Sequence, residues 1–136
     1  MNPKKILIVE DSDLLHRMYD LVLKPYRTGA TPTEVLHCMN GRQALETLND
    51  HPDIDLILLD INMPVMSGLE FLAFRKEQKV FQEIPVIIVS TEGKEHDIIL
   101  GLERGARGYL TKPFQPNQLH TLIDRLFGTQ QSNAIR

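Results

Sequence analysis

Five short runs of mostly apolar residues recur along the chain, and each leads into a polar turn. They are Ile6–Val9, Val35–Met39, Ile57–Leu59, Val86–Val89 and Tyr109–Leu110. Because these runs lack the alternation of apolar and polar positions that marks a half-exposed strand, they are typical of strands buried on both faces. The pattern therefore predicts the five strands of a parallel sheet.

Each predicted strand is followed by a segment with helical periodicity. Apolar residues recur every three or four positions in five stretches: Leu14–Val22, Ala44–Leu48, Leu69–Ala73, Ile98–Leu102 and Leu119–Leu126. This spacing places them on one face of a helix. Asp13 is well placed to cap the first helix, Ser67 and Gly68 open the third, and we expect Gly105 to close the fourth in a left-handed conformation.

Strand followed by helix, five times over, predicts one three-layer α/β domain with right-handed crossovers. The 136 residues of the chain match about one domain in length. We place this domain at residues 1–128. Residues 129–136 show no periodicity, and we expect a flexible C-terminal tail there. The longest connection runs from Lys24 to Thr33.

Composition and charge are those of an ordinary globular domain. Apolar residues make up 42% of the chain and charged residues 24%, with a net charge of -3. No basic block is present, so we expect no binding to nucleic acid. Cys38 is the only cysteine, which excludes an internal disulfide. The sequence has neither a signal-peptide core nor a run of membrane length, and we expect a cytoplasmic protein without membrane insertion.

Four of the five predicted strands end in residues that carry an acid, a hydroxyl or an amine. These strand ends are Glu10-Asp11, Asp60, Ser90-Thr91 and Thr111-Lys112-Pro113, whereas the second strand ends in Asn40-Gly41, which has the composition of a plain turn. The carboxyl ends of parallel strands meet at one edge of the sheet, where ligands bind beside the switch point in strand order. Each residue alone has an ordinary structural explanation, but together they predict one site.

Three carboxylates, a hydroxyl and a lysine have the composition of a site for a divalent cation and a phosphoryl group. Unit charges ~5 Å apart repel by roughly 3 kcal/mol at an effective dielectric of about 20, so three clustered carboxylates need a cation. Mg²⁺ takes oxygen ligands and is usually held by one or two carboxylates plus phosphate. A carboxylate can also attack phosphorus to give an aspartyl-phosphate, whose oxygens Lys112 and Ser90 would neutralise and hydrogen-bond.

Five short motifs lie in order at the predicted strand ends: Ile8–Asp11, Leu59–Pro64, Ser67-Gly68, Val89–Thr91 and Gly108–Phe114. With these motifs, from about Lys4 to Phe127, the chain resembles the response-regulator receiver domains of two-component signalling, of the stand-alone chemotaxis type. The resemblance implies a flavodoxin-like, doubly wound parallel sheet of five strands in the order 2-1-3-4-5, with five helices. It also implies a signalling phosphoprotein that promotes its own phosphorylation and dephosphorylation, and not an enzyme.

The resemblance assigns the acidic residues to phosphoryl transfer. Asp60 matches the residue that accepts a phosphoryl group from a sensor histidine kinase. Asp11 would bind Mg²⁺ directly, Glu10 would act through water, and Asn62 would give its backbone carbonyl. Asp60 belongs to the same set of metal-binding residues. Glu10 stands where Asp is commoner in the family, which moves its carboxylate one methylene outward. The implied cofactor is therefore Mg²⁺.

The other matched residues are assigned to sensing the phosphoryl group. Ser90 matches the switch hydroxyl, Lys112 the phosphate-pairing lysine, and Tyr109 the aromatic that changes rotamer on activation. Ser90 stands where Thr is more usual, which removes a methyl group that packs against the sheet. Thr91 stands where Ala or Gly often leaves an opening to the phosphorylation site, so we expect its bulk to slow access of the phosphodonor. The Lys112–Pro113 peptide is expected to be cis. Output is expected at the face formed by the fourth helix, fifth strand and fifth helix.

Two other classes of protein would use a similar fold. A haloacid-dehalogenase-type phosphohydrolase needs a second Asp two residues after the nucleophile, and Asn62 stands there. A flavodoxin-like cofactor carrier needs a phosphate-binding loop where Glu10–Asp13 would repel an anion. Within the favoured family, the sequence leaves open a downstream protein target or a shuttle to a histidine phosphotransfer protein. We expect a monomer or a weak dimer, and no helical metal site, because the five histidines lack i,i+3 or i,i+4 pairing.

Overall fold

The main sheet has five parallel strands, seen in a computed structural model that describes residues 3–24, 27–28, 31–91 and 93–127. In spatial order the strands are β4 (Glu34–Cys38), β1 (Lys5–Val9), β5 (Leu56–Asp60), β6 (Val86–Thr91) and β7 (Gly108–Lys112). All four neighbouring pairs in this sheet are parallel. Counted among these five strands, the order is 2-1-3-4-5, which confirms the predicted fold class.

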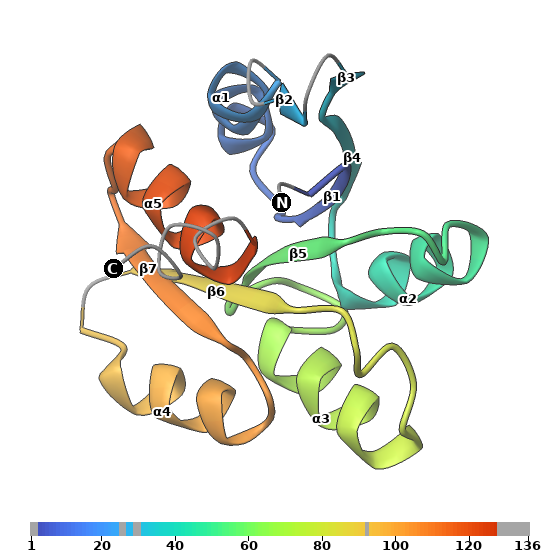
Figure 1. Ribbon diagram of the computed structural model, residues 1–136. Coiled ribbons are helices and arrows are strands. Elements are labelled where there is room, and N and C mark those ends of the chain that lie inside the picture. Colours follow the sequence, from blue (N-terminus) through green and yellow to red (C-terminus); the bar gives the residue numbers. More distant parts are fainter. Residues whose placement is uncertain (1–2, 25–26, 29–30, 92, 128–136) are drawn as a thin grey trace, which may run out of the picture.

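Five helices cover the two faces of this sheet (Figure 1). They are α1 (Asp13–Leu23), α2 (Gly41–Asp50), α3 (Gly68–Gln78), α4 (Glu95–Glu103) and α5 (Pro116–Phe127). Helices α1 and α5 lie on one face, and α2, α3 and α4 lie on the other. Successive side chains of β1 alternate between two apolar clusters: Ile6 and Ile8 pack toward α1 and α5, whereas Leu7 and Val9 pack on the opposite face. Burial on both faces explains the continuous apolar runs in the sequence.

The first helix is capped by another residue than the predicted Asp13, and the second helix is capped from the segment predicted to be a plain turn. Ser12 caps α1, because its hydroxyl accepts a hydrogen bond from the Leu15 backbone N–H at 3.3 Å, and Asp13 is the first helical residue. The side chain of Asn40 caps α2 by accepting from the Gln43 backbone N–H at 2.9 Å, so this segment is more than a plain turn. Both are short polar side chains that reach the free N–H groups of a first helical turn.

Other boundaries follow the sequence more closely. Ser67 opens α3 through a reciprocal capping box with Glu70, and Gly105 follows α4 with φ of 108°, as predicted. The long connection after α1 contains a small antiparallel pair, β2 (Arg27–Thr28) and β3 (Thr31–Pro32), which is too short for a periodic pattern to reveal. The predicted C-terminal tail lies outside the described residues.

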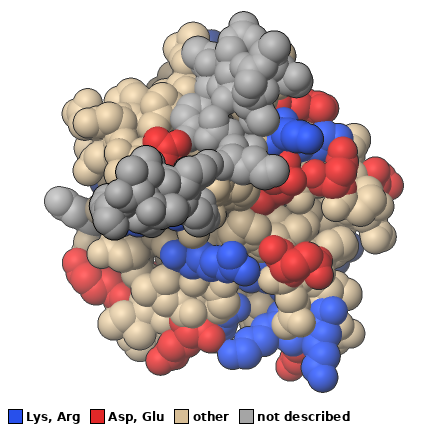
Figure 2. Space-filling model, viewed as in Figure 1, with Lys and Arg blue, Asp and Glu red and all other residues tan. Residues whose placement is uncertain are grey.

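The surface mixes both signs of charge. Figure 2 shows acidic and basic side chains interspersed over the described part of one face. Among the helices that the structure describes, none combines the length and the apolar character needed to cross a bilayer.

Candidate functional site

The pairing of β1 with β5 brings two of the predicted acids to the same face of the sheet. Ile8 lies opposite Leu58 in this parallel pair, and both side chains belong to the cluster under α1 and α5. Glu10 and Asp60 lie two residues further along each chain, so they continue the same row. Their carboxylates therefore stand at the rim of the apolar core, at the carboxyl edge of the sheet.

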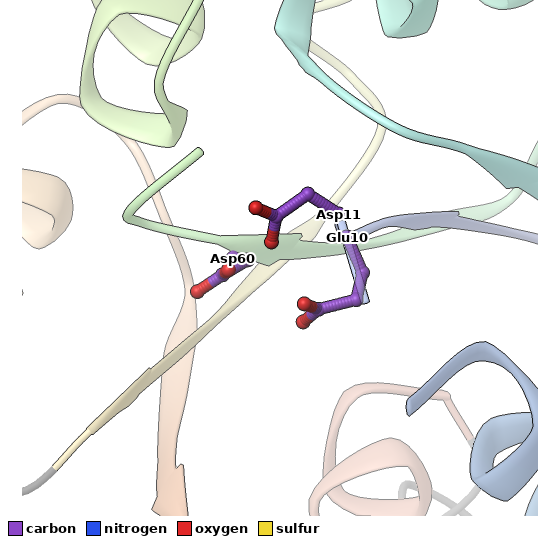
Figure 3. Close-up of side chains that lie close together, drawn as sticks. All are labelled: Glu10, Asp11 and Asp60. Carbon is purple, nitrogen blue, oxygen red and sulfur yellow. The ribbon is translucent and has the colours of Figure 1, made fainter. Parts of the chain in front are cut away.

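Glu10, Asp11 and Asp60 form one cluster of carboxylates (Figure 3). One oxygen from each carboxylate lies within 4.8 Å of the other two. Glu10 and Asp60 are buried, whereas Asp11 is exposed. The cluster thus offers three oxygen donors at a position that solvent reaches from the side of Asp11.

Lys112 adds the positive charge that faces these acids. Its Nζ donates to Glu10 Oε1 at 3.1 Å and lies 3.5 Å from Asp60 Oδ1. Lys112 is the last residue of β7, and the peptide bond to Pro113 is cis. When all three carboxylates are ionised, one ammonium leaves two negative charges without a partner in the cluster. Such an excess favours the binding of a further cation.

Burial raises the pKa values of both Glu10 and Asp60 above their ordinary range. For Glu10, burial is the largest cause and the charge of Asp60 adds to it, while Lys112 opposes both. For Asp60, burial is again the largest cause, opposed by Lys112 and by a hydrogen bond from the Asn62 backbone, whereas Asp11 adds to the rise. Two buried carboxylates whose charged forms are disfavoured, beside one lysine, are typical of a functional site.

The donor set of this cluster fits Mg²⁺. The donors are oxygens, the carboxylates outnumber the ammonium, and the exposed Asp11 leaves room for the waters that Mg²⁺ usually keeps. Glu10, Asp11 and Asp60 would hold the ion.

Ser90 and Thr91 end β6 and Tyr109 lies on β7, but the side chains of these three residues contact groups outside the cluster. Ser90 is fully buried, and its hydroxyl donates to the Thr91 carbonyl at 3.2 Å. Thr91 is exposed and, with Lys112, lines a recess of about 350 Å³ against α1. Tyr109 is 49% exposed and lines a second groove of about 350 Å³ with Ile99 of α4. The structure therefore brings Lys112 to the acids and leaves the Ser90 hydroxyl bonded to the backbone.

A second polar group beside the cluster is missed by the sequence analysis. His16 of α1 lies against His37 of β4, and its Nε2 reaches the carbonyl oxygen of Glu10 at 2.6 Å. The two histidines are 21 positions apart, so no local spacing connects them. The sequence carries only a weak signal for this contact. His37 interrupts the otherwise apolar run Val35–Met39, and His16 and Asp20 lie one helical turn apart.

Comparison with known proteins agrees with this fold. The chain matches the family described as "Response regulator receiver domain" over residues 6–124. It is 34% identical over 125 residues to the chemotaxis protein CheY1 of Helicobacter pylori, covering 92% of this chain and 98% of that protein. It is 32% identical over 125 residues to a chemotaxis protein CheY homolog of Campylobacter jejuni, covering 92% of this chain and 93% of that protein.

A solved structure shows the same likeness. The chemotaxis protein CheY4 of Vibrio cholerae superposes with a TM-score of 0.77 at 32% identity, covering 90% of this chain and 98% of that chain. The chain therefore belongs to the response regulator receiver domain family, whose members serve in two-component signalling. Within that family it is similar to the chemotaxis receivers of the CheY type.

Asp60→Asn is expected to raise the melting temperature in the absence of divalent cations. Since the folded-state pKa of Asp60 is raised, the stability that this carboxyl contributes is fully present below its unfolded pKa and is lost as pH rises through its folded pKa. At pH 7 the ionised side chain therefore opposes folding, and a neutral amide of the same shape removes that opposition. We expect a gain of about 1 kcal/mol, or roughly 4 °C, by calorimetry in EDTA.

Added Mg²⁺ provides the internal control for this measurement. It should stabilise the wild-type protein more than Asp60→Asn, because the variant lacks one ligand. If the variant melted below the wild type in EDTA, the ionised Asp60 carboxylate would be stabilising the fold, contrary to the raised pKa.

Proposed function

We propose that the protein acts as a response regulator that accepts a phosphoryl group from a sensor histidine kinase on Asp60, in a Mg²⁺-dependent reaction. The observation that carries the proposal is the meeting of Asp60 with Glu10, Asp11 and Lys112 at the carboxyl edge of the sheet. Membership of the receiver family supports it. So does the match to chemotaxis receivers over nearly their whole length.

The proposed chemistry is a nucleophilic attack by the Asp60 carboxylate. One carboxylate oxygen bonds to the phosphorus of a phosphohistidine, the P–N bond breaks, and the leaving imidazole nitrogen keeps the electron pair and takes a proton from solvent. The product is an acyl phosphate. Lys112 Nζ, now 3.5 Å from Asp60 Oδ1, is placed to pair with the phosphoryl oxygens. Bound Mg²⁺ supplies positive charge that offsets the phosphoryl and carboxylate charges.

Direct metal contact suits Asp11 and Asp60 better than Glu10. Both Glu10 oxygens already accept hydrogen bonds: Oε1 from Lys112 at 3.1 Å and Oε2 from the Ser12 backbone N–H at 3.2 Å. These bonds favour a role for Glu10 through a water molecule. The backbone carbonyl of Asn62 completes the proposed ligand set.

The experiment that tests this function is a labelling reaction with a small phosphodonor, an acyl phosphate or a phosphoramidate, in Mg²⁺. We expect the intact mass to rise by one phosphoryl group, and EDTA to abolish the rise. Labelling that is equally fast in EDTA would contradict the metal dependence. Absence of labelling in Mg²⁺ would contradict the function.

We propose that the output surface comprises α4, β7 and α5. A phosphoryl group held by Lys112 would draw the Ser90 hydroxyl away from the Thr91 carbonyl and toward the phosphate. The vacated space beside α4 would then admit the Tyr109 ring, which now stands half exposed in the groove that Ile99 lines. A few kcal/mol from the phosphate contacts suffices to shift such a two-state equilibrium.

Tyr109→Ala is expected to leave phosphorylation of Asp60 nearly intact while weakening binding of the activated form to its target. Ser90→Ala should uncouple phosphorylation from the Tyr109 response, because it removes the hydroxyl that links them. NMR of the Tyr109 ring, with and without beryllofluoride as a phosphoryl analogue, measures that response. A ring whose contacts stay unchanged on activation would contradict the switch.

The alternative output is a phosphorelay, in which Asp60 passes its phosphoryl group to a histidine phosphotransfer protein. Incubating the phosphorylated protein with such proteins from the same organism distinguishes the two. Rapid loss of the label to a histidine would favour the shuttle, and stable complex formation without transfer would favour a direct effector.

A further inference from the structure

Three side chains form a polar chain from the edge of the sheet to the backbone of the carboxylate cluster. Asp20 Oδ1 of α1 lies 2.7 Å from His37 Nε2 of β4. His37 Nδ1 faces His16 Nδ1 at 2.5 Å, and His16 Nε2 lies 2.6 Å from the Glu10 carbonyl oxygen. The chain therefore runs without a gap from Asp20 to Glu10.

The two imidazole rings face each other through their Nδ1 atoms. Their centroids are 4.6 Å apart with an interplanar angle of 74°. The Nδ1 atoms are only 2.5 Å apart, and the ring centres reach a separation of 4.6 Å only when both Nδ1 atoms lie close to the line that joins them. Each Nδ1 therefore points almost directly at the other. The lone pair of one ring is thus aimed at the N–H of the other, as a hydrogen bond requires.

The acceptors at the two ends of this chain fix the donors. The Glu10 carbonyl and the Asp20 carboxylate can only accept, so the Nε2 atoms of both rings carry protons. His16 Nε2–H therefore donates to the Glu10 carbonyl, and His37 Nε2–H donates to Asp20.

The two rings differ in their surroundings. His37 contacts the carboxylate of Asp20 and has a side chain that is 29% exposed. His16 is buried and lies between His37 and the Glu10 carbonyl. The contacts at both ring nitrogens therefore hold the His16 ring in one orientation.

We propose that His16 is a positioning residue for the metal site: oriented by His37 and Asp20, its Nε2–H fixes the Glu10 carbonyl and so the plane of the peptide that leads into Asp11. The Glu10 N–H donates to the Cys38 carbonyl at 3.1 Å, so both polar groups of the Glu10 backbone are held. Because the peptide unit is planar, fixing the Glu10 carbonyl also fixes the positions of the Asp11 backbone nitrogen and Cα.

This role resembles that of groups that orient metal ligands without touching the metal, whose loss typically weakens metal binding by about 10–100-fold. The role in metal binding rests on the proposed function, because it assumes that Asp11 binds Mg²⁺. The hydrogen bonds of the two rings do not depend on it.

The first test measures the ring protons without any metal. Nitrogen-15 NMR of the histidine side chains should show a proton on Nε2 of both His16 and His37. A His16 ring that carries its proton on Nδ1 and none on Nε2 in the wild-type protein would overturn the proposed chain.

The second test measures Mg²⁺ affinity by calorimetric titration with the metal alone. His16→Leu should bind Mg²⁺ about tenfold more weakly than the wild type. His16→Gln, whose amide N–H can donate in place of Nε2, should stay close to it. His51→Gln, at the end of α2, is the matched control and should match the wild type.

The outcomes separate the positioning role from the proposed function. Equal Mg²⁺ affinity of His16→Leu and the wild type would overturn the positioning role alone. A wild-type protein that binds no Mg²⁺ would overturn the role and the proposed function together. If His16 had a purely structural role, His16→Leu and Asp20→Asn would have a lower unfolding free energy, but their folded forms would bind Mg²⁺ as tightly as the wild type. That result would also overturn the positioning role.

Discussion

Asp60→Asn is expected to reduce phosphoryl acceptance below detection, a loss of more than about 100-fold. The amide has no ionised oxygen to attack phosphorus and cannot form an acyl phosphate. Glu10 is the other buried acid beside Lys112, but both of its oxygens accept hydrogen bonds, from Lys112 and from the Ser12 backbone. We therefore do not expect Glu10 to replace Asp60 as the acceptor.

The rate of mass gain with a small phosphodonor in Mg²⁺ measures this loss. Asp50→Asn, which changes an exposed acid at the end of α2, is the matched control and should label at the wild-type rate. Combined with the expected gain in melting temperature, Asp60→Asn should be more stable in EDTA and yet inert. Labelling of Asp60→Asn at the rate of Asp50→Asn would rule out Asp60 as the acceptor.

Lys112→Met is expected to lower the unfolding free energy by about 3 kcal/mol at pH 7 without divalent cations, because it leaves two buried carboxylates without their cation. Lys112 lowers the pKa values of Glu10 and Asp60, so its removal raises them further. The stability tied to raised pKa values is present at low pH and is lost as pH rises through them. The difference in unfolding free energy between Lys112→Met and the wild type should therefore increase from pH 4 to pH 7.

Urea unfolding at pH 4 and pH 7 measures this difference in unfolding free energy, and Mg²⁺ at pH 7 should reduce it. Lys24→Met is the matched control: Lys24 is exposed and lies 3.8 Å from Asp20, and a surface pair of this kind contributes less than about 1 kcal/mol. If Lys112→Met lost no more stability than Lys24→Met, the ion pairs of Lys112 would not hold the cluster together.

The strands and the acidic edge could be predicted from the sequence because each depends on a rule that acts locally. Burial on both faces requires continuous apolar runs, and parallel pairing gathers the residues that follow those runs at one edge. Asp60 and Lys112 are 52 positions apart, yet both follow from where their strands end. The order of the strands did not follow from any pattern and came from the family resemblance alone.

The contacts that the sequence did not reveal depend on how elements pack. Arg75 of α3 has the pattern of a surface arginine, yet it is 4% exposed and donates to the carbonyls of Ile84 and Gly105, at 2.7 and 3.4 Å. His16 and His37 meet only because α1 crosses β4 at their level. Helical or strand periodicity shows which face of an element is buried, but it does not show which residue of a neighbouring element lies opposite.

The most direct test is to locate the phosphoryl group on the chain. The protein is labelled with a small phosphodonor in Mg²⁺ and reduced with borohydride, which converts an aspartyl-phosphate to homoserine. Peptides are then sequenced by mass spectrometry. We predict homoserine at position 60 and at no other aspartate. Reduction at Asp11 or Glu10 instead, or a phosphoryl group that resists borohydride and lies on a serine, threonine or histidine, would contradict phosphorylation of Asp60.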